Sequence, residues 1–144
     1  MQTIRPLAAT DWDGWSPLWS GYLDFYREEL PEATSRSTFT RLCDGTDGLF
    51  GLLALEDEAA IGLASCVVHA TTWSPQPRTY LQDLFVAPAA RGGEVGHALL
   101  GAVKEAAAAR GAPDVYWHTQ QFNGRARSLY DQVGRLTSFV VYEM

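Results

Sequence analysis

One glycine-rich segment carries the groups best suited to bind a ligand. An apolar run ends at a turn marked by Pro88, and residues 91–97 (Arg-Gly-Gly-Glu-Val-Gly-His) then lead into a helical repeat of apolar residues. Where a strand passes into a helix in this way, successive backbone N–H groups stay unpaired at the positive end of the helix dipole. Glycine lets a ligand approach the backbone closely because it has no Cβ atom. The sequence therefore predicts a phosphate-binding corner at residues 91–97.

Two common nucleotide-binding loops do not fit this segment. A Walker loop ends in Gly-Lys followed by Ser or Thr, whereas Gly96 is followed by His97 and Ala98. A dinucleotide fingerprint spaces its glycines as G-x-G-x-x-G, and Gly92, Gly93 and Gly96 are spaced differently. A different class of phosphate-bearing ligand is therefore expected.

The segment resembles the pyrophosphate loop of the Gcn5-related N-acetyltransferase (GNAT) family. The family motif is Gln/Arg-x-x-Gly-x-Gly/Ala, and this chain reads Arg-Gly-Gly-Glu-Val-Gly from Arg91 to Gly96, with Glu94 where the family usually has glycine. A second family signature, Asn-x-x-Ala-x-x-Leu-Tyr with a later closing glycine, is matched by Asn123–Tyr130 and Gly134. The two motifs together make the resemblance specific.

The resemblance implies an α/β chain with the acyl-CoA N-acyltransferase fold and acetyl-CoA as cosubstrate. In the family, the loop backbone binds the pyrophosphate and the pantetheine arm follows the preceding strand. The residues expected at the cofactor are Leu84, Phe85, Val86, Arg91, Gly92, Gly93, Glu94, Val95, Gly96, His97, Asn123 and Tyr130. The resemblance places Tyr130 near the cofactor sulfur, where a phenol that is protonated at neutral pH can donate to the leaving thiolate.

Aromatic residues near the N-terminus indicate the acceptor side. The run Trp19, Tyr22, Phe25 and Tyr26 is similar to the acceptor-side helix of family members that act on polyamines or other small amines. As a whole, the chain most resembles the small-amine, polyamine or histone acetyltransferase-like members of the family. The residues expected to contact a primary amine are Tyr22, Tyr26, Glu28 and Gln82. A small amine or polyamine is the expected acceptor.

The general base is open between two residues. Relatives that act on polyamines often carry Glu-Asp in the strand before the loop, whereas this chain has Gln82-Asp83, and Gln82 cannot accept a proton. Asp83 is the expected catalytic base, acting through water, although strand alternation points it to the opposite face from Gln82. His118 is an alternative, because histidine accepts protons at neutral pH. A purely structural role is open for each of them.

Glu94 has two opposite expected effects on the cofactor site. A carboxylate at a helix N-terminus is itself favourable, typically by about 0.3–1 kcal/mol. Beside a pyrophosphate the same charge repels the ligand and competes for the N–H donors. The direction in which the side chain points decides between the two.

Composition excludes several function classes. The formal net charge of −6 argues against nucleic acid as a partner. Cys43 and Cys66 lie far from any metal-ligand pattern, so no metal site is expected. No N-terminal leader pattern is present, and no apolar run approaches the ~20 residues that span a bilayer. We expect no membrane partner and a cytoplasmic location.

Residues 1–144 are expected to form a single α/β domain, with a mixed, mostly antiparallel sheet and helices on both faces. The predicted strands are residues 2–7, 49–55, 60–69, 80–86, 115–119 and 138–143. The predicted helices lie between residues 10 and 30, where a second start at Pro17 is open, and over 37–43, 96–110 and 123–133. A proline-containing loop is expected at 73–78.

The sequence as a whole predicts an N-acetyltransferase that moves an acetyl group from acetyl-CoA to a primary amine. Direct attack is expected, because neither cofactor motif contains a cysteine that could carry the acyl group. The alternative is a non-catalytic acyl-CoA-binding or regulatory module on the same fold, which Gln82 and Glu94 favour and Tyr130 opposes. A homodimer is expected, since related acetyltransferases often pair through C-terminal strands and an apolar edge strand needs cover.

Overall fold

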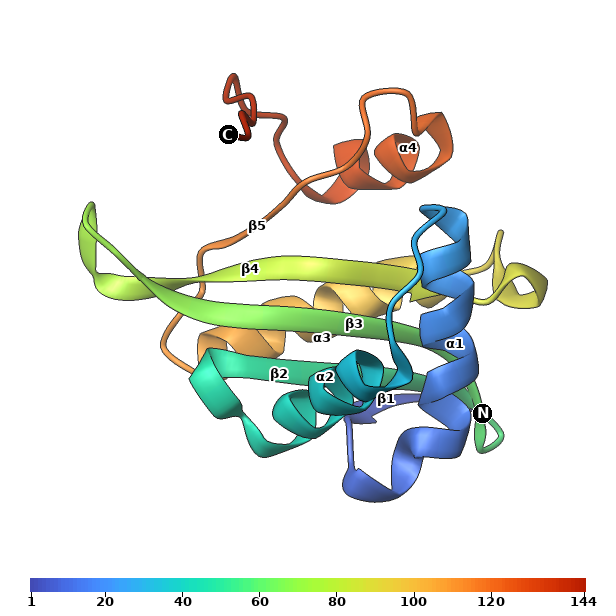
Figure 1. Cartoon of the computed structure of the whole chain (residues 1–144). Coiled ribbons are helices and arrows are strands. Elements are labelled where there is room, and N and C mark those ends of the chain that lie inside the picture. The colour runs from blue at the N-terminus through green and yellow to red at the C-terminus, as the bar shows by residue number, and fades with distance from the viewer.

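A five-stranded sheet with helices on both faces forms the framework of the computed structural model, which describes all of residues 1–144 (Figure 1). The strands lie in chain order, β1 to β5. The first four are antiparallel, and β5 joins β4 in parallel. The predicted mixed, mostly antiparallel sheet is therefore confirmed. The elements are β1 (Gln2–Pro6), α1 (Trp12–Phe25), α2 (Glu32–Asp44), β2 (Leu49–Glu56), β3 (Ala59–Thr71), β4 (Ser74–Val86), α3 (Val95–Ala109), β5 (Val115–Trp117) and α4 (Gly124–Val133).

Two apolar clusters, one on each face of the sheet, hold the helices in place. On the first face, α1 and α2 pack on the sheet through Leu7, Trp15, Leu18, Trp19, Phe39, Leu42, Leu53, Leu55, Leu63 and Phe85. On the second face, α3 packs through Phe50, Leu52, Ala54, Ala64, Cys66, Leu81, Val95, Leu99, Leu100 and Val103. Neighbouring residues of each strand alternate between the two clusters, as the pleat of a sheet requires.

A bulge in β4 interrupts this alternation beside the predicted site. Ser65 of β3 lies opposite Asp83, but the next residue, Cys66, lies opposite Leu81, so Gln82 is an extra residue without a partner in β3. Leu81 faces α3, and simple alternation would turn Asp83 to the same face. Because of the bulge, Asp83 instead shares the α1 face with Phe85.

Two predicted helices differ from those observed. The first is one continuous helix, α1, with Pro17 inside it and no second start. Trp15, Leu18 and Trp19 are buried on either side of Pro17, so the apolar stripe packs through the proline position, while Pro17 itself faces solvent. The second helix, α2, is longer than the predicted 37–43 because it already starts after Pro31. No helix has both the length and the apolar character that a bilayer span requires.

The proline-containing loop predicted at 73–78 is wrong, because β4 already starts at Ser74. A two-residue turn, Thr72-Trp73, joins β3 to β4, and the resulting hairpin extends past the ends of its neighbours (Figure 1). Prolines are tolerated where a strand end has no further neighbour to bond. Pro75 and Pro77 indicated a loop in the sequence, but both lie within the first residues of β4.

The strand predicted at Ser138–Glu143 is also absent. This segment has no regular structure, and its large apolar side chains are exposed, Phe139 for example at 78%. A strand needs a partner edge as well as β-forming residues. The outer edge of β5 is unpaired, but the segment does not reach it as a strand.

Candidate active site

The segment between β4 and α3 presents the unpaired backbone N–H groups that the sequence predicts. A short 3₁₀ turn, Pro88–Ala90, follows β4, and α3 begins at Val95. The first N–H in α3 with a backbone acceptor is that of Ala98, which donates to Glu94 O at 2.9 Å. The N–H groups of residues 92–97 make no hydrogen bond to another protein group. The corner therefore offers several donors at the positive end of the α3 dipole.

The glycines of this corner serve different purposes. Gly92 has φ +88°, a left-handed conformation that favours glycine. A Cβ at Gly93 would meet nothing closer than 3.7 Å, so this position is open above the backbone. A Cβ at Gly96 would lie 3.0 Å from Leu129 Cδ2, so Gly96 allows α4 to pack closely on α3. Gly92 and Gly93, but not Gly96, thus have free space for a ligand, since a Cβ at Gly92 would meet nothing within 4 Å.

The remaining corner residues divide between core and solvent. Val95 is buried in the cluster beneath α3, so only its backbone can face a cofactor. Glu94 and His97 are exposed, and the Glu94 side chain does not cap the helix. Arg91 folds back on β4: its Nε donates to Val86 O at 2.9 Å, and its guanidinium lies 5.1 Å from the centroid of the Phe85 ring.

The strand before the corner has a free edge. β5 pairs with β4 only from Thr79 to Leu81, and beyond Trp117 the chain leaves the sheet (Figure 1). The backbone of residues 83–86 is bonded to β3 on one side and has no strand on the other. Leu84, Phe85 and Val86 face the two cores with their side chains, so they can meet a pantetheine arm only through this edge.

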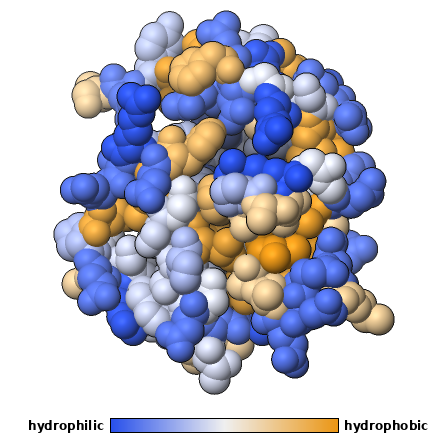
Figure 2. Space-filling view, turned by 90° about the vertical axis from the view of Figure 1, so that its right-hand side faces the viewer, coloured by the Kyte–Doolittle hydropathy of each residue, from blue (hydrophilic) through white to orange (hydrophobic).

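A groove of about 680 Å³ opens between α1 and the end of β4. Its lining includes Gly21 and Phe25 from α1, and Phe85, Pro88 and Arg91 from the segment that enters the corner. Figure 2 faces this end of the molecule, where apolar surface is surrounded by hydrophilic side chains.

Asp83 lies at the centre of a second group of residues, on the α1 face of the sheet. It is only 8% exposed, and burial raises the pKa of its carboxyl above the ordinary value. The hydroxyls of Tyr22 and Ser65 face the carboxylate and act in the opposite direction. Burial also raises the pKa values of Tyr22 and Tyr26, and the nearby charge of Asp83 raises them further. A buried carboxylate thus sits among phenols.

The other two predicted acceptor residues lie farther out. Gln82, the bulged residue, is exposed, and Glu28 is exposed beyond the end of α1. The helix ends in a Schellman-type turn in which the Glu28 N–H donates to Leu23 O at 2.9 Å, with Arg27 in the left-handed conformation (φ +56°). Of the four predicted acceptor residues, the structure brings Tyr22 and Tyr26 to Asp83 and leaves the two polar ones in solvent.

Tyr130 lies in α4, where its side chain packs against the apolar cluster beneath α3. Asn123 starts this helix by accepting a hydrogen bond from the Ala126 N–H at 3.3 Å, and Gly134 closes it. The Tyr130 ring lies 5.4 Å from that of Trp117, edge to face. Burial raises the pKa of Tyr130, and the nearby Tyr26 raises it further. Asn123 therefore positions α4, and Tyr130 reaches the neighbourhood of Tyr26.

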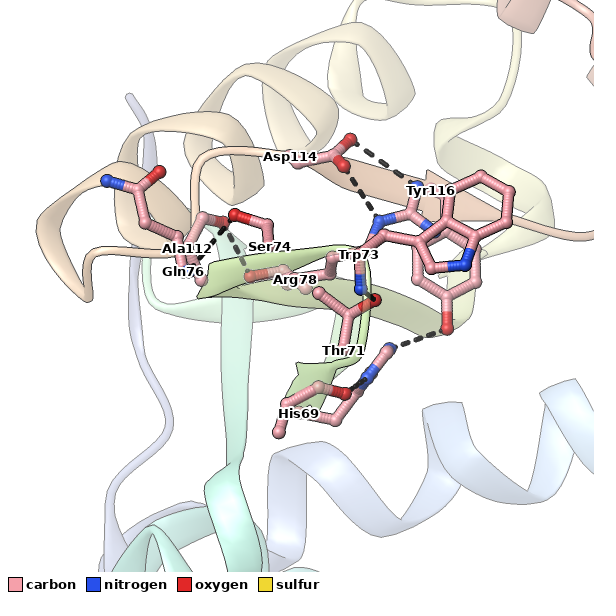
Figure 3. Close-up of polar contacts among 11 residues, drawn as sticks. His69, Thr71, Trp73, Ser74, Gln76, Arg78, Ala112, Asp114 and Tyr116 are labelled. Atoms are coloured by element: carbon pink, nitrogen blue, oxygen red, sulfur yellow. Dashed lines mark hydrogen bonds and ion pairs between the residues drawn. The ribbon is translucent and has the colours of Figure 1, made fainter.

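Sequence reasoning missed a set of rings on β3, β4 and β5. Tyr80 stacks on Tyr116 with centroids 5.0 Å apart, and Tyr116 Oη lies 2.7 Å from His69 Nε2. The alternative base, His118, is exposed, and its Nδ1 lies 3.2 Å from Tyr80 Oη. Figure 3 shows His69 directed at the Tyr116 hydroxyl, and Arg78 between that ring and Asp114.

Tyr80 is near both these rings and the Asp83 carboxylate. Burial raises the pKa of its hydroxyl, and Tyr116 and Asp83 raise that pKa further. No motif marked it. Its place three residues before Asp83 was the only available signal.

Comparison with known proteins identifies the class of this chain. A model described as the acetyltransferase (GNAT) family matches residues 15–134. The D-amino-acid N-acetyltransferase HPA3 of Saccharomyces cerevisiae is 35% identical over 142 residues, covering 97% of this chain and 88% of that protein. The uncharacterized N-acetyltransferase YhfO of Bacillus subtilis is 31% identical over 141 residues, covering 96% and 94%. A solved aminoglycoside N-acetyltransferase, AAC(6')-Iy in complex with CoA, has the same fold with a TM-score of 0.88 at 20% identity, covering 100% of this chain and 94% of that one.

The family match and the fold together define an acyl-CoA N-acyltransferase. The chain belongs to the GNAT family and is an acetyl-CoA-dependent N-acetyltransferase. The similarity to named N-acetyltransferases favours a catalytic function over the non-catalytic acyl-CoA-binding module that the sequence left as an alternative. The finer likeness to polyamine or histone-type members is not confirmed, because HPA3 is named for D-amino acids, the solved neighbour is named for aminoglycosides, and the name of YhfO gives no substrate.

Proposed function

We propose that this enzyme acetylates the primary amine of a small molecule by direct attack on acetyl-CoA, with Asp83 as the base and Tyr130 as the acid. The observation that carries the proposal is the meeting of three features at one end of β4. These are the unpaired N–H groups of residues 92–97, the free edge of residues 83–86 and the buried Asp83 carboxylate. A cofactor that followed the corner and then the edge would end beside the carboxylate.

The cofactor half of the site acts through backbone groups. The N–H groups of residues 92–97 would bind the pyrophosphate, and the open position at Gly93 would admit it. The free edge beside Leu84, Phe85 and Val86 would bond the pantetheine amides and polarise the thioester carbonyl. Asn123 would contribute by fixing the helix that carries Tyr130.

The acceptor half acts through side chains. An ammonium group is attracted both by a carboxylate and by the faces of aromatic rings, and Asp83 offers the former among Tyr22, Tyr26 and Tyr80. Asp83 would take one proton from this ammonium, and its raised pKa makes it a stronger base than an exposed carboxylate.

The free amine would then form a C–N bond to the thioester carbon as the C–S bond breaks. Tyr130 would give its proton to the departing sulfur, and the tyrosinate would recover a proton as the new amide loses its second one.

Neither cysteine is suited to an acyl-enzyme route. Cys66 is fully buried on the α3 face, and burial raises the pKa of its thiol to about 12. Cys43 lies in α2, and burial raises its pKa also. A thiol that stays protonated is a poor nucleophile, which supports direct attack.

A panel of amines tests the proposal, with release of free CoA thiol as the readout. We propose small amines, polyamines included, as acceptors. The panel also needs D- and L-amino acids, because of the yeast relative, and aminoglycosides, because of the solved neighbour. At least one small amine should give turnover that Asp83→Asn lowers by roughly 10²–10⁴-fold. Full activity of that variant on every accepted amine would exclude Asp83 as the base.

We also propose that the enzyme is a homodimer. The unpaired outer edge of β5 and the exposed apolar segment at Ser138–Glu143 support this, because both gain a partner when a second copy supplies it. The mass in solution at micromolar concentration should be twice the 15.8 kDa of one chain. Removal of residues 136–144 should yield the monomer. A monomeric mass for the full chain would contradict the proposal.

A further inference from the structure

A serine without a hydrogen-bond partner is buried directly opposite Asp83. Ser65 is the β3 residue paired with Asp83, and it is 4% exposed. Its Oγ forms no hydrogen bond of regular geometry, although it lies close enough to the Asp83 carboxylate to favour the ionised form. A buried hydroxyl without a partner is costly and rare, so its presence calls for a physical explanation.

The packing around Ser65 does not explain why a hydroxyl is buried there. Two residues before it, Leu63 is fully buried in the apolar cluster under α1, and on the other side Ser65 pairs with Gly51 of β2. An alanine at position 65 would fill nearly the same volume without the cost of a buried hydroxyl. The Ser65 hydroxyl can therefore offset its cost of burial only by interacting with Asp83.

Sheet geometry makes that use feasible. Directly opposite residues of antiparallel strands have Cβ atoms about 4.5–5.5 Å apart, and a serine hydroxyl rotates freely to find an acceptor. The bulge at Gln82 is what sets Asp83 opposite Ser65 and on the same face. Without it, the carboxylate would turn to the α3 face and lose this neighbour.

The other titratable groups near Asp83 come from three elements. Tyr22 and Tyr26 approach from α1, Tyr80 from β4, and Cys66 from β3 with its side chain in the cluster beneath α3. Of the neighbours, only the Tyr22 and Ser65 hydroxyls support the ionised carboxylate, against burial. Tyr22 also faces the space assigned to the acceptor, whereas Ser65 lies within the sheet.

We propose that Ser65 is a positioning residue: its hydroxyl donates to the Asp83 carboxylate and aims that carboxylate at the acceptor amine. This inference rests on the proposed function, in which Asp83 is the base. Ser65 touches neither substrate, and its effect reaches the reaction through Asp83 alone.

The test compares Ser65→Ala with Ser35→Ala, a matched control. Ser35 is a second buried serine, and it accepts a hydrogen bond from Trp19 Nε1 at 3.0 Å, away from Asp83. Ser65→Ala should move the acid limb of kcat/KM to higher pH by about one pH unit, because the charged carboxylate loses a donor. At a pH on that acid limb, a shift of one unit should lower turnover by up to about tenfold. Ser65→Thr, which keeps the hydroxyl, should return the limb toward its original position, and Ser35→Ala should not move it.

A second readout, free of turnover, follows the carboxyl itself. In protein labelled at the aspartate side chains, the ¹³C titration of Asp83, assigned by its loss in Asp83→Asn, should shift to higher pH in Ser65→Ala. An inactive Asp83→Asn together with an unmoved acid limb and titration in Ser65→Ala would overturn this inference alone. An active Asp83→Asn would overturn the proposed base, and the inference with it.

Discussion

The two halves of the proposed active site are built from different parts of the chain. The cofactor half is a local structure, made of backbone groups from one continuous segment between the end of β4 and the first turn of α3. The acceptor half is assembled from side chains of α1, β3, β4 and α4 that are distant in sequence. A local backbone site follows from residue order and glycine spacing, whereas a side-chain site depends on packing. The following variants separate the two halves.

The largest effect is expected at Tyr130, where the two halves meet. Tyr130→Phe removes the proposed proton donor but keeps the ring against Trp117. Turnover should fall by roughly 10²–10⁴-fold with little change in CoA affinity. Trp73→Phe, at the exposed turn between β3 and β4, is the control and should behave as the parent enzyme. Near-native turnover of Tyr130→Phe on the best amine would remove Tyr130 from the mechanism.

Substitution in the corner should act on the cofactor half alone. Gly93→Val places a side chain where the structure has open space, so it should block the pyrophosphate without disturbing the fold. Calorimetric CoA binding should weaken by about tenfold to a hundredfold, the equivalent of one or two charge-assisted hydrogen bonds.

A matched pair of glycines gives the controls for that measurement. Gly96→Val should instead destabilise the protein by about 1–3 kcal/mol, because it presses on Leu129. Gly101→Ala, in an open position of α3, should bind CoA normally and slightly stabilise the helix. If Gly93→Val bound CoA as the parent does, the corner would not be the phosphate site.

The acceptor half should be a source of instability. The pKa of Asp83 is raised in the folded state, so its contribution to stability is present at low pH and lost as the pH rises through that raised pKa. Asp83→Asn removes the ionisation and should have the higher melting temperature at pH 8. The difference should shrink as the pH falls through the raised pKa and vanish only below about pH 3, where Asp83 is protonated in the folded and the unfolded chain alike. A melting temperature that is lower than the parent's at every pH would mean that the carboxylate stabilises the fold.

The smallest effect is expected at Glu94. Its side chain is exposed and does not cap α3, so its charge acts on the pyrophosphate only through solvent. Glu94→Gln should tighten CoA binding a fewfold, the equivalent of about 1 kcal/mol, and more at low salt. Glu105→Gln, on the same helix and equally exposed, is the control. Weaker binding across all salt concentrations would show that Glu94 helps to order the corner.

The contrast between local and distant structure also explains what could be predicted from the sequence. The corner, the Asn123 cap and the hairpin of β2 and β3 follow from residue order, and the structure contains each of them. The final strand, Ser138–Glu143, could not be judged locally, because a strand requires a partner edge.

The acceptor half was harder to predict for a similar reason. The one-residue bulge at Gln82 decides which face Asp83 joins, and no local signal marks it. Because the sequence does not reveal the bulge, it could predict neither the pairing of Asp83 with Ser65 nor the position of Tyr80 near Asp83. The register of β3 and β4, which depends on packing, brings Ser65 and Tyr80 close to Asp83, and their residue types alone do not indicate it.

The structure of a complex with a bisubstrate analogue, in which CoA is linked to the best amine of the panel, would show both halves of the site in one measurement. The pyrophosphate should lie on the N–H groups of residues 92–97, and the pantetheine arm should follow residues 83–86. The acceptor nitrogen should lie within hydrogen-bond distance of the Asp83 carboxylate or of one water bound to it. An acceptor nitrogen bound away from Asp83, for example beside His118, would exclude Asp83 as the base.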